Sequence, residues 1–178
     1  MSLPVPTTVA ARGVHQFTHM NRSDFLQVFY KQRCSWDMLL ERVDPERMTI
    51  PGVEGDCSIK DILTHVTWYE REMVELLQRR RLAGSDLWNL PHAERNALIY
   101  QQNRTRSPED VLTEASAVYQ QLLDLMEGLS DAELGDPRPF ADMPEDWIPW
   151  QLIAENTYDH YRDHAQSIQA WLDRSEKS

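Results

Sequence analysis

One segment decides the fold: Trp147–Leu172, with the sequence WIPWQLIAENTYDHYRDHAQSIQAWL. Its apolar residues recur with the period of an α-helix, and one narrow stripe of that helix holds Ile153, Thr157, His160, His164, Ile168 and Trp171. Two histidines therefore lie on the face that should be buried. Because residues four apart are neighbours on a helix, both imidazoles can reach one metal ion, and a third ligand must come from elsewhere.

The composition is that of an ordinary globular protein. The chain has 178 residues, of which 41% are hydrophobic and 26% charged, and this length predicts one domain. No apolar run approaches the ~20 residues that span a bilayer, so we expect no membrane segment. Cys34 and Cys57 form no paired motif, and the N-terminus lacks the pattern of a signal peptide. Both features predict a reducing, cytoplasmic location.

The charge argues against nucleic acid as a partner. The chain has 29 acidic and 18 basic residues, which give a formal net charge of −11. Binding to a nucleic-acid backbone depends on Lys and Arg that neutralise phosphates. The one basic run, Arg79–Arg81, falls where a helix should end, and basic residues suit the negative end of the helix dipole. We therefore expect a small-molecule substrate and no nucleic acid.

The remaining periodic segments predict an all-α four-helix bundle. Helices are expected from Asn21 or Ser23 to about 43, over 59–77, from Ser107 to about 129, and over Trp147–Leu172. The connection between the second and third is unusually long. It should contain a short extra helix over about 91–104 and cross the bundle, where it can cover an opening. The bundle domain is expected over residues 21–174, with an N-terminal extension over 1–20 and a tail over 175–178.

A third histidine lies on the inward face of the second predicted helix. That face holds Ile62, His65, Val66, Tyr69, Met73 and Leu76. Three desolvated imidazoles in one small core are costly unless hydrogen bonds or a metal satisfy them, so we predict that His65, His160 and His164 bind one ion. Three histidines leave a position for water or substrate, as in catalytic zinc sites. Zinc is the first choice and nickel the second.

Other polar residues near this face are candidates for supporting roles. Tyr69, Thr157 and Tyr158 are placed for hydrogen bonds to substrate or to the ligands, and they are the candidate catalytic residues. The acidic residues that flank the histidines lie off the stripe, and we expect Asp159 and Asp163 on a solvated face. His15 and His19 are also four apart, but no helical pattern surrounds them, so a surface position is expected.

Two stretches resemble a known family. Ile59-Lys-Asp-Ile-Leu-Thr-His65-Val-Thr-Trp68-Tyr-Glu70 and Asn156-Thr-Tyr-Asp-His160-Tyr-Arg-Asp-His164 are similar to the second and fourth helices of the DinB-like superfamily of four-helix bundles. Leu129-Ser-Asp-Ala-Glu-Leu134 and Trp147-x-x-Trp150 are most similar to the branch that includes the colibactin self-resistance proteins. The likeness covers about residues 21–173. Where the family pattern has a tryptophan before the second helix, this chain has Cys57.

The resemblance implies a divalent metal, commonly zinc or nickel, on three histidines that map onto His65, His160 and His164. Characterised relatives include bacillithiol S-transferases and mycothiol-dependent maleylpyruvate isomerases, which implies thiol-dependent detoxification with a low-molecular-weight thiol as cosubstrate. The colibactin-resistance relatives act as hydrolases and need not keep the three histidines. The branch therefore leaves the reaction open between transfer to a thiol and hydrolysis.

Two classes of function compete. The first is a metal-dependent transferase or hydrolase that acts on a small electrophile. The alternative is a non-catalytic protein that sequesters a toxin or another small molecule, with Trp36, Trp68 and Trp150 as pocket walls, although tryptophans on bundle helices are usually core residues. A structural role as a homodimer is a third hypothesis, and it explains the histidines least well.

Overall fold

The structure, a computed structural model, describes residues 20–82 and 84–175. The helices are α1 (Arg22–Glu41), α2 (Ile59–Arg79), α3 (His92–Asn103), α4 (Pro108–Glu127), α5 (Asp131–Gly135), α6 (Pro149–Glu155) and α7 (Tyr158–Ser175), with short 3-10 turns η1 (Pro45–Arg47) and η2 (Asp86–Asn89). Within these residues, extended backbone pairs only at isolated bridges. His15 and His19 lie outside the described residues, and so does nearly all of the predicted N-terminal extension.

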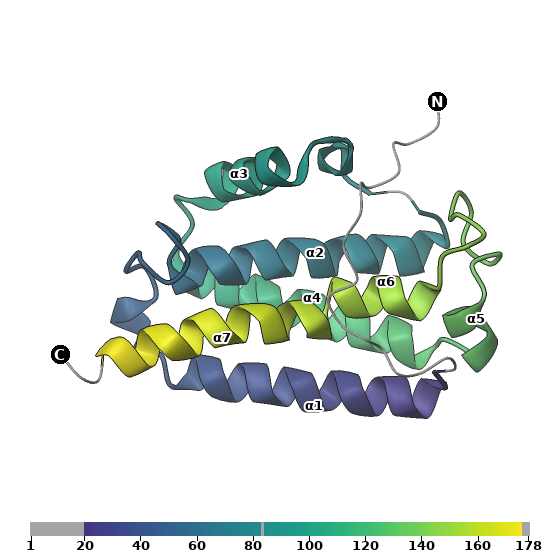
Figure 1. Cartoon of the computed structure of the whole chain (residues 1–178), viewed down its shortest axis with the longest axis horizontal. Coiled ribbons are helices and arrows are strands. Elements are labelled where there is room, and N and C mark those ends of the chain that lie inside the picture. Colours follow the sequence, from purple (N-terminus) through teal and green to yellow (C-terminus); the bar gives the residue numbers. More distant parts are fainter. Residues whose placement is uncertain (1–19, 83, 176–178) are drawn as a thin grey trace.

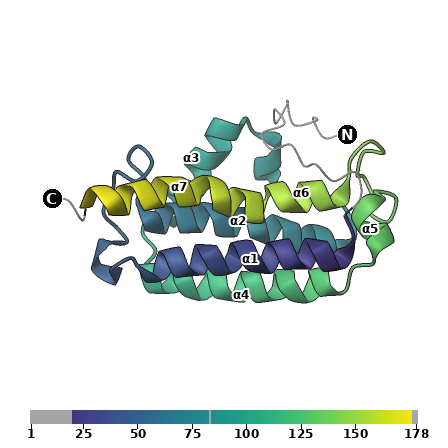
Figure 2. The same cartoon turned by 60° about the horizontal axis from the view of Figure 1, so that its bottom comes forward.

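Four rods run side by side and form the bundle: α1, α2, α4, and α6 with α7 laid end to end (Figures 1 and 2). Helix α2 packs along α4, and α1 packs along α7. The predicted all-α four-helix bundle is confirmed. No helix among the described residues has the length and apolar content needed to cross a bilayer.

Side-chain caps begin most of these helices where the sequence predicts. Ser58 and Asp61 form a reciprocal capping box at the start of α2, and Ser107 caps α4, in which Pro108 is the first residue. Ser130 and Glu133 form a second capping box, which starts the short helix α5 directly after α4. The segment that follows α4 is therefore a separate helical turn and not a continuous loop.

The long last helix predicted over 147–172 is broken, and this expectation is wrong. Helix α6 ends at Glu155 and α7 begins at Tyr158. At the break, the amide of Asn156 bonds the carbonyl oxygen of Leu152 at 2.7 Å, and the hydroxyl of Thr157 donates to the carbonyl oxygen of Ile153 at 2.7 Å. Such bonds from side chains to the preceding turn compete with the helical ladder and bend helices. The histidines both lie in α7, beyond the break.

A buried ion pair lies inside the bundle. The carboxylate of Glu70, 1% exposed, lies 3.5 Å from Nη1 of Arg33, and the hydroxyl of Tyr161 donates to it. The guanidinium of Arg33 also packs over the ring of Tyr119 at 4.0 Å and bonds Asp37 at 2.8 Å. Burial raises the pKa of Glu70 to about 7, although Arg33 and Tyr161 act in the opposite direction. The pair thus links α1, α2 and α7 through polar contacts in an otherwise apolar core.

The connection from α2 to α4 covers the outer side of α2. Its helix α3 lies above α2 in Figure 1 and packs directly on it. Trp68, Tyr69 and Ile99 form a small hydrophobic cluster there, against which Leu87 and Trp88 of the η2 turn pack. The short extra helix predicted over about 91–104 is confirmed. The connection makes α2 a helix that is buried nearly all round, which creates the setting for the candidate site.

Candidate metal centre

Three imidazoles meet on the side of α2 that faces α7. Nε2 of His160 lies 3.0 Å from Nε2 of His65 and 3.1 Å from Nε2 of His164. One ring nitrogen from each residue lies within 4.8 Å of the others. The pair on α7 comes from the four-residue spacing that puts both rings on one face, and His65 is brought to them by the packing of α2 against α7. The structure therefore brings together the three predicted ligands.

The spacing of these nitrogens fits a divalent ion. Zinc bound to histidine at 2.0–2.1 Å in a tetrahedron places neighbouring ligand nitrogens about 3.3 Å apart. The two separations from His160, 3.0 and 3.1 Å, are within a few tenths of an ångström of that value, and the third pair lies within 4.8 Å. Histidine nitrogens suit zinc, nickel, cobalt or iron, so the donor set does not select one metal.

The hydrogen-bond partner of His164 leaves the lone pair of its Nε2 free to face the other two rings. Nδ1 of His164 lies 2.8 Å from the Glu54 carboxylate, which accepts its hydrogen and leaves Nε2 free to bind a cation. Nδ1 of His160 is buried without a hydrogen-bond partner. Without a cation, three Nε2 atoms face one another and only a shared hydrogen can relieve them. A metal ion would use all three lone pairs at once.

The surroundings keep the rings neutral, as metal ligands must be. The pKa of His65 is lowered to about 3, chiefly by burial, and the neighbouring His164 and His92 act in the same direction. Burial also lowers the pKa of His160 well below its usual value, helped by its two histidine neighbours. Protonation therefore does not compete with a metal ion at these two residues near neutral pH.

A cavity of about 130 Å³ opens beside the histidines. Its lining residues come from the loop before α2, from α2, from α3 and from α7: Glu54, Cys57, Asp61, Ile62, His65, Asn96, Tyr100 and His164. The cavity is large enough for a few waters or the reacting end of a small molecule. Burial and the nearby carboxylates of Asp61 and Glu54 raise the pKa of the Cys57 thiol. Cys57 therefore faces the cavity as a neutral thiol.

Tyr69 forms a wall of the centre but directs its hydroxyl away from it. Its ring meets the rings of His65 and His160 edge to face, with centroids 4.9 Å apart in both cases. The hydroxyl accepts from Nε of Arg95 and donates to the amide oxygen of Asn96, both at 3.1 Å. Burial raises the pKa of this phenol, against the charge of Arg95. Tyr69 thus fixes the histidine rings and ties them to α3.

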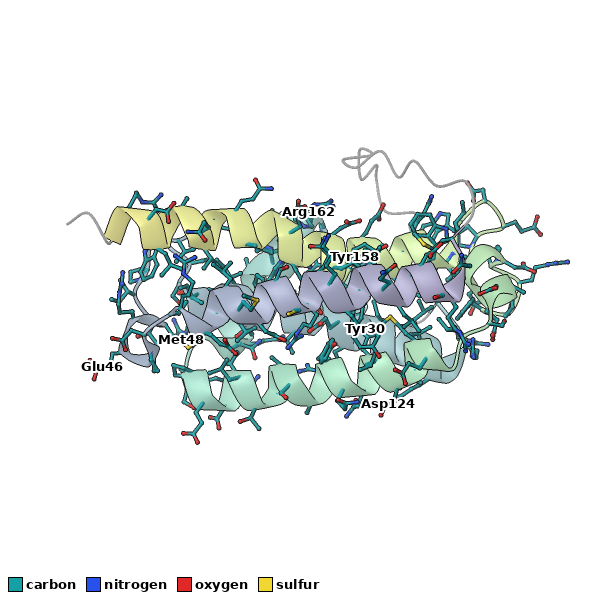
Figure 3. All side chains as sticks on the ribbon, turned by 90° about the horizontal axis from the view of Figure 1, so that it is seen from below. Tyr30, Glu46, Met48, Asp124, Tyr158 and Arg162 are labelled. Carbon is teal, nitrogen blue, oxygen red and sulfur yellow. The ribbon has the colours of Figure 1, made fainter. Side chains whose placement is uncertain are left out.

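The other two candidate catalytic residues lie away from the cavity. Thr157 is fully buried and uses its hydroxyl on the backbone at the helix break. Tyr158 lies between α7 and α1, where its ring meets that of Phe25 edge to face at 5.9 Å (Figure 3). Asp159 is 8% exposed and pairs with Arg162 at 2.9 Å, so the expectation of a solvated position was wrong for it.

Sequence reasoning missed several residues of this site. Glu54 precedes its partner His164 by 110 positions and lies in a loop without a periodic pattern, so nothing in the sequence pairs them. Arg95, Asn96 and Tyr100 belong to α3, whose weak amphipathic pattern predicted a helix but not which side it presents. The one available signal was the length of the connection, which indicated that it covers an opening.

Comparisons with known proteins show which family and which solved structures this chain is similar to. A sequence model described as the DinB superfamily matches residues 29–168. A solved structure from Streptococcus pneumoniae is similar, with a TM-score of 0.75, 16% identity, and coverage of 88% of this chain and 93% of that one. The colibactin self-resistance protein ClbS, crystallised in complex with double-stranded DNA, has a TM-score of 0.70, 16% identity, and coverage of 88% and 98%.

DfsB, described as a sibling lethal factor precursor, is also similar, with a TM-score of 0.68, 14% identity, and coverage of 88% and 98%. A search of curated proteins gives no significant match. At these identities the likeness concerns the fold. The expected resemblance to DinB-like bundles is confirmed, with proteins of the colibactin-resistance branch among the structures that share the fold.

The exclusion of nucleic acid as a partner is wrong. ClbS has this fold and was crystallised with double-stranded DNA. The net charge of −11 is summed over the whole chain, whereas a phosphate backbone meets one local surface. Arginines cluster at one end of this bundle: Arg80 is the C-cap of α2, Arg81 follows it, and Arg138 lies after α5. A whole-chain charge could not exclude a contact with nucleic acid there.

Proposed function

The chain belongs to the DinB superfamily, and on that premise we propose that it is a divalent-metal-dependent enzyme of small-molecule detoxification, either a thiol S-transferase or a hydrolase. The single observation that carries the proposal is the convergence of the Nε2 atoms of His65, His160 and His164 beside a cavity. Three histidine ligands leave a coordination position for a reactant, which is typical of catalytic and not of structural sites.

The three histidines would hold the metal, with zinc as the first choice and nickel as the second. A bound divalent ion supplies an acidified water or thiol, which is nucleophilic near neutral pH. The Glu54 carboxylate holds the hydrogen on Nδ1 of His164 and so keeps Nε2 as a ligand atom. Tyr69 supports two of the rings from the side, through edge-to-face contacts.

The cavity supplies the rest of the proposed site. Asn96 and Tyr100 reach it from α3 and can donate hydrogen bonds to a substrate, and Ile62 gives it an apolar floor. Glu54 is the carboxylate nearest to the ligands that can accept a proton. Burial raises its pKa, but the hydrogen bonds from His164 and Ser167 and the nearby imidazoles together outweigh this effect, so the pKa is lowered and the group is ionised near neutral pH.

Metal content provides the direct test. The protein should be purified without a histidine tag, and its zinc and nickel should be measured by mass spectrometry before and after incubation with each metal. We expect about one equivalent in the wild type and a strong loss in His160→Ala. His92→Ala is the matched control, because this exposed histidine lies outside the cluster. A wild-type protein that takes up neither metal at micromolar concentration would refute the proposal.

Separate assays distinguish the two reactions. The metal-loaded protein should be incubated with an aryl halide electrophile and a low-molecular-weight thiol, and in parallel with an activated ester and water alone. Loss of thiol with the first pair indicates a transferase, and thiol-independent release of the ester's alcohol indicates a hydrolase. In either case the activity should disappear in His160→Ala and persist in His92→Ala.

Sequestration without catalysis is the alternative. Its predicted pocket walls fit poorly, because Trp36 and Trp150 are 1% and 2% exposed in the main core. This alternative predicts that a bound small molecule raises the melting temperature equally with and without a chelator. The enzyme proposal predicts that the chelator abolishes turnover.

Double-stranded DNA is a second candidate partner, favoured by the ClbS complex. Arg80 pairs with Glu133 at 2.6 Å and Arg81 with Asp142 at 3.4 Å, so a phosphate backbone would replace these carboxylates. Fluorescence anisotropy with a short labelled duplex at low and physiological salt tests this. Binding should weaken steeply with salt and in the double variant Arg80→Gln/Arg81→Gln. Absence of binding at low salt removes this candidate.

A further inference from the structure

A second and larger cavity lies against the C-terminal half of α2. Trp88 lines it, and its indole contacts the ring of Tyr69, with ring centroids 5.6 Å apart. The volume is about 300 Å³, at the lower end of the range for cavities that hold small organic molecules. Its lining comes from α2, from the η2 turn, from the loop before α6 and from α6 itself. None of the three histidines lines it.

Most of the wall is apolar. Met73 and Leu76 come from α2, Leu82 from the segment after it, Trp147 and Leu152 from α6 and the residues before it, and Trp88 from η2. The indoles of Trp88 and Trp147 offer flat surfaces, and the thioether of Met73 is polarizable, and both properties suit an aromatic ring. An apolar enclosure of this kind favours a planar hydrophobic body.

One carboxylate is buried in this apolar wall. Glu72 is 6% exposed, and its Oε2 accepts hydrogen bonds from Nε1 of Trp88 at 2.6 Å and from the backbone N–H of Ser85 at 2.9 Å. Burial raises the pKa of Glu72, while these hydrogen bonds oppose the rise. Both donors are neutral, and the charge of nearby Arg71 affects this pKa less than burial and the hydrogen bonds do. A cation in the cavity would therefore add a direct partner for the carboxylate.

The backbone is built to approach this carboxylate closely. A Cβ added at Gly84 would lie 2.1 Å from Oε2 of Glu72 and 2.8 Å from the indole of Trp88. A side chain at position 84 would therefore collide with Glu72 and Trp88, and glycine allows the turn to lie against the carboxylate. This close fit fixes both the carboxylate and the indole at the cavity wall, so the polar group has a defined position toward any ligand.

The charge of the lining also favours a cation. The lining contains one guanidinium, that of Arg81, and three carboxylates, those of Glu72, Asp86 and Asp142. Arg81 and Asp142 pair with each other at 3.4 Å and are more than half exposed, which places them at the rim. The enclosed part thus combines two indoles with a negative charge, and both features attract an organic cation. The guanidinium of Arg95, 4.5 Å from the centroid of the Trp88 ring, shows that this indole already attracts one cation.

We propose that this cavity binds a small aromatic molecule that carries a cationic nitrogen, with the ring between Trp88 and Trp147 and the nitrogen at Glu72. The site is separate from the histidines, and it binds its ligand whether or not they hold a metal. It defines a chemical class of ligand, the arylalkylamines, that the metal centre alone does not specify.

Isothermal titration calorimetry at pH 7 with three isosteres tests the proposal. 2-Naphthylmethylamine is cationic, 2-naphthylmethanol is neutral and 2-naphthoate is anionic, and all three carry the same ring. We expect the amine to bind about tenfold more tightly than the alcohol, and the carboxylate to bind most weakly. In Glu72→Gln the amine should lose this advantage, because the amide can still accept from Trp88 but carries no charge. Glu75→Gln is the matched control and should keep it, because this half-buried carboxylate on the same helix lies outside the cavity lining and pairs with Arg79.

A second variant keeps the test independent of the folding of Glu72→Gln. Leu152→Trp fills the cavity from α6 and should abolish binding of the amine, while zinc uptake by the histidines stays at the wild-type level. The proposal is overturned if the amine does not bind at millimolar concentration. It is equally overturned if the three isosteres bind alike, or if Leu152→Trp leaves the affinity for the amine unchanged.

Discussion

The buried pair of Arg33 and Glu70 predicts a large non-additive effect on stability. We consider the single variants Arg33→Met and Glu70→Leu and the double variant that joins them. Removal of one partner leaves the other charge in a low-dielectric core, whereas removal of both replaces the pair with apolar side chains of similar volume. The two single changes should therefore destabilise the fold, and the second change should largely repair the first.

The geometry sets the size of each effect. The two side chains are 10% and 1% exposed, and loss of one partner of such a pair costs about 3–5 kcal/mol. In Glu70→Leu, Arg33 keeps its bond to Asp37 at 2.8 Å, so the cost should be near ~3 kcal/mol. In Arg33→Met, Glu70 keeps the hydroxyl of Tyr161, and the cost should be nearer ~5 kcal/mol. For a chain of this length each kcal/mol lowers the melting temperature by about 2–4 °C.

Thermal and urea denaturation followed by circular dichroism measure the cycle. The measurements belong at pH 8, above the pKa of about 7 that burial gives Glu70, so that its carboxylate is ionised. The double variant should lie within ~2 kcal/mol of the wild type. The exposed pair of Glu75 and Arg79 is the control, and its coupling should not exceed ~0.5 kcal/mol. If the double variant is as unstable as the two single losses added together, the reasoning about the buried pair is refuted.

Three further predictions concern the two cavities. Glu54→Gln should weaken zinc binding about 10–100-fold, measured by competition with a chromogenic chelator. Asp56→Asn, which changes an exposed carboxylate in the same loop, should leave zinc binding unchanged. Equal zinc affinities in both variants would contradict the role of Glu54. Because the folded state depresses the pKa of His65 to about 3, the unfolded state binds more protons below about pH 6.5. The metal-free wild type should therefore lose more stability than His65→Leu as the pH falls from about 6.5 to 4 in urea denaturation, and parallel losses would count against a neutral His65. Gly84→Ala should push its turn away from Glu72 and speed hydrogen exchange at the Ser85 amide, and unchanged protection there would show that the contact is not needed.

The bundle and the candidate metal-binding histidines could be predicted because they rest on local periodicity. The caps at Ser58 and Ser107 and the four-residue spacing of His160 and His164 are properties of short stretches, and the long helices α1, α2 and α4 follow from such stretches. The meeting of His65 with the other two required packing, but an inward face on each helix was enough to expect it. Here sequence pattern and tertiary structure agree.

The rest of the site depends on contacts that no local pattern records. Glu54 reaches His164 across 110 positions, and Arg95 reaches the hydroxyl of Tyr69 from a helix with a weak amphipathic pattern. The break between α6 and α7 was also missed, since Asn156 and Thr157 occupy positions that a continuous helix tolerates. Their side chains decide the outcome by bonding the preceding turn.

The burial of α2 on all sides explains why both cavities lie along this helix. An amphipathic helix of a simple bundle leaves one face in water, but α2 buries polar residues on its outer face as well, among them Lys60 and Glu72. The connection from α2 to α4 satisfies these groups: the ammonium of Lys60 donates to the carbonyl oxygen of Arg104 at 2.9 Å, and Trp88 donates to Glu72. The connection also contributes to the lining of both cavities: Asn96 and Tyr100 line the smaller one, and Gly84, Ser85, Asp86, Trp88 and Asn89 line the larger one. The same connection that buries the histidines therefore also leaves room for a reactant beside them.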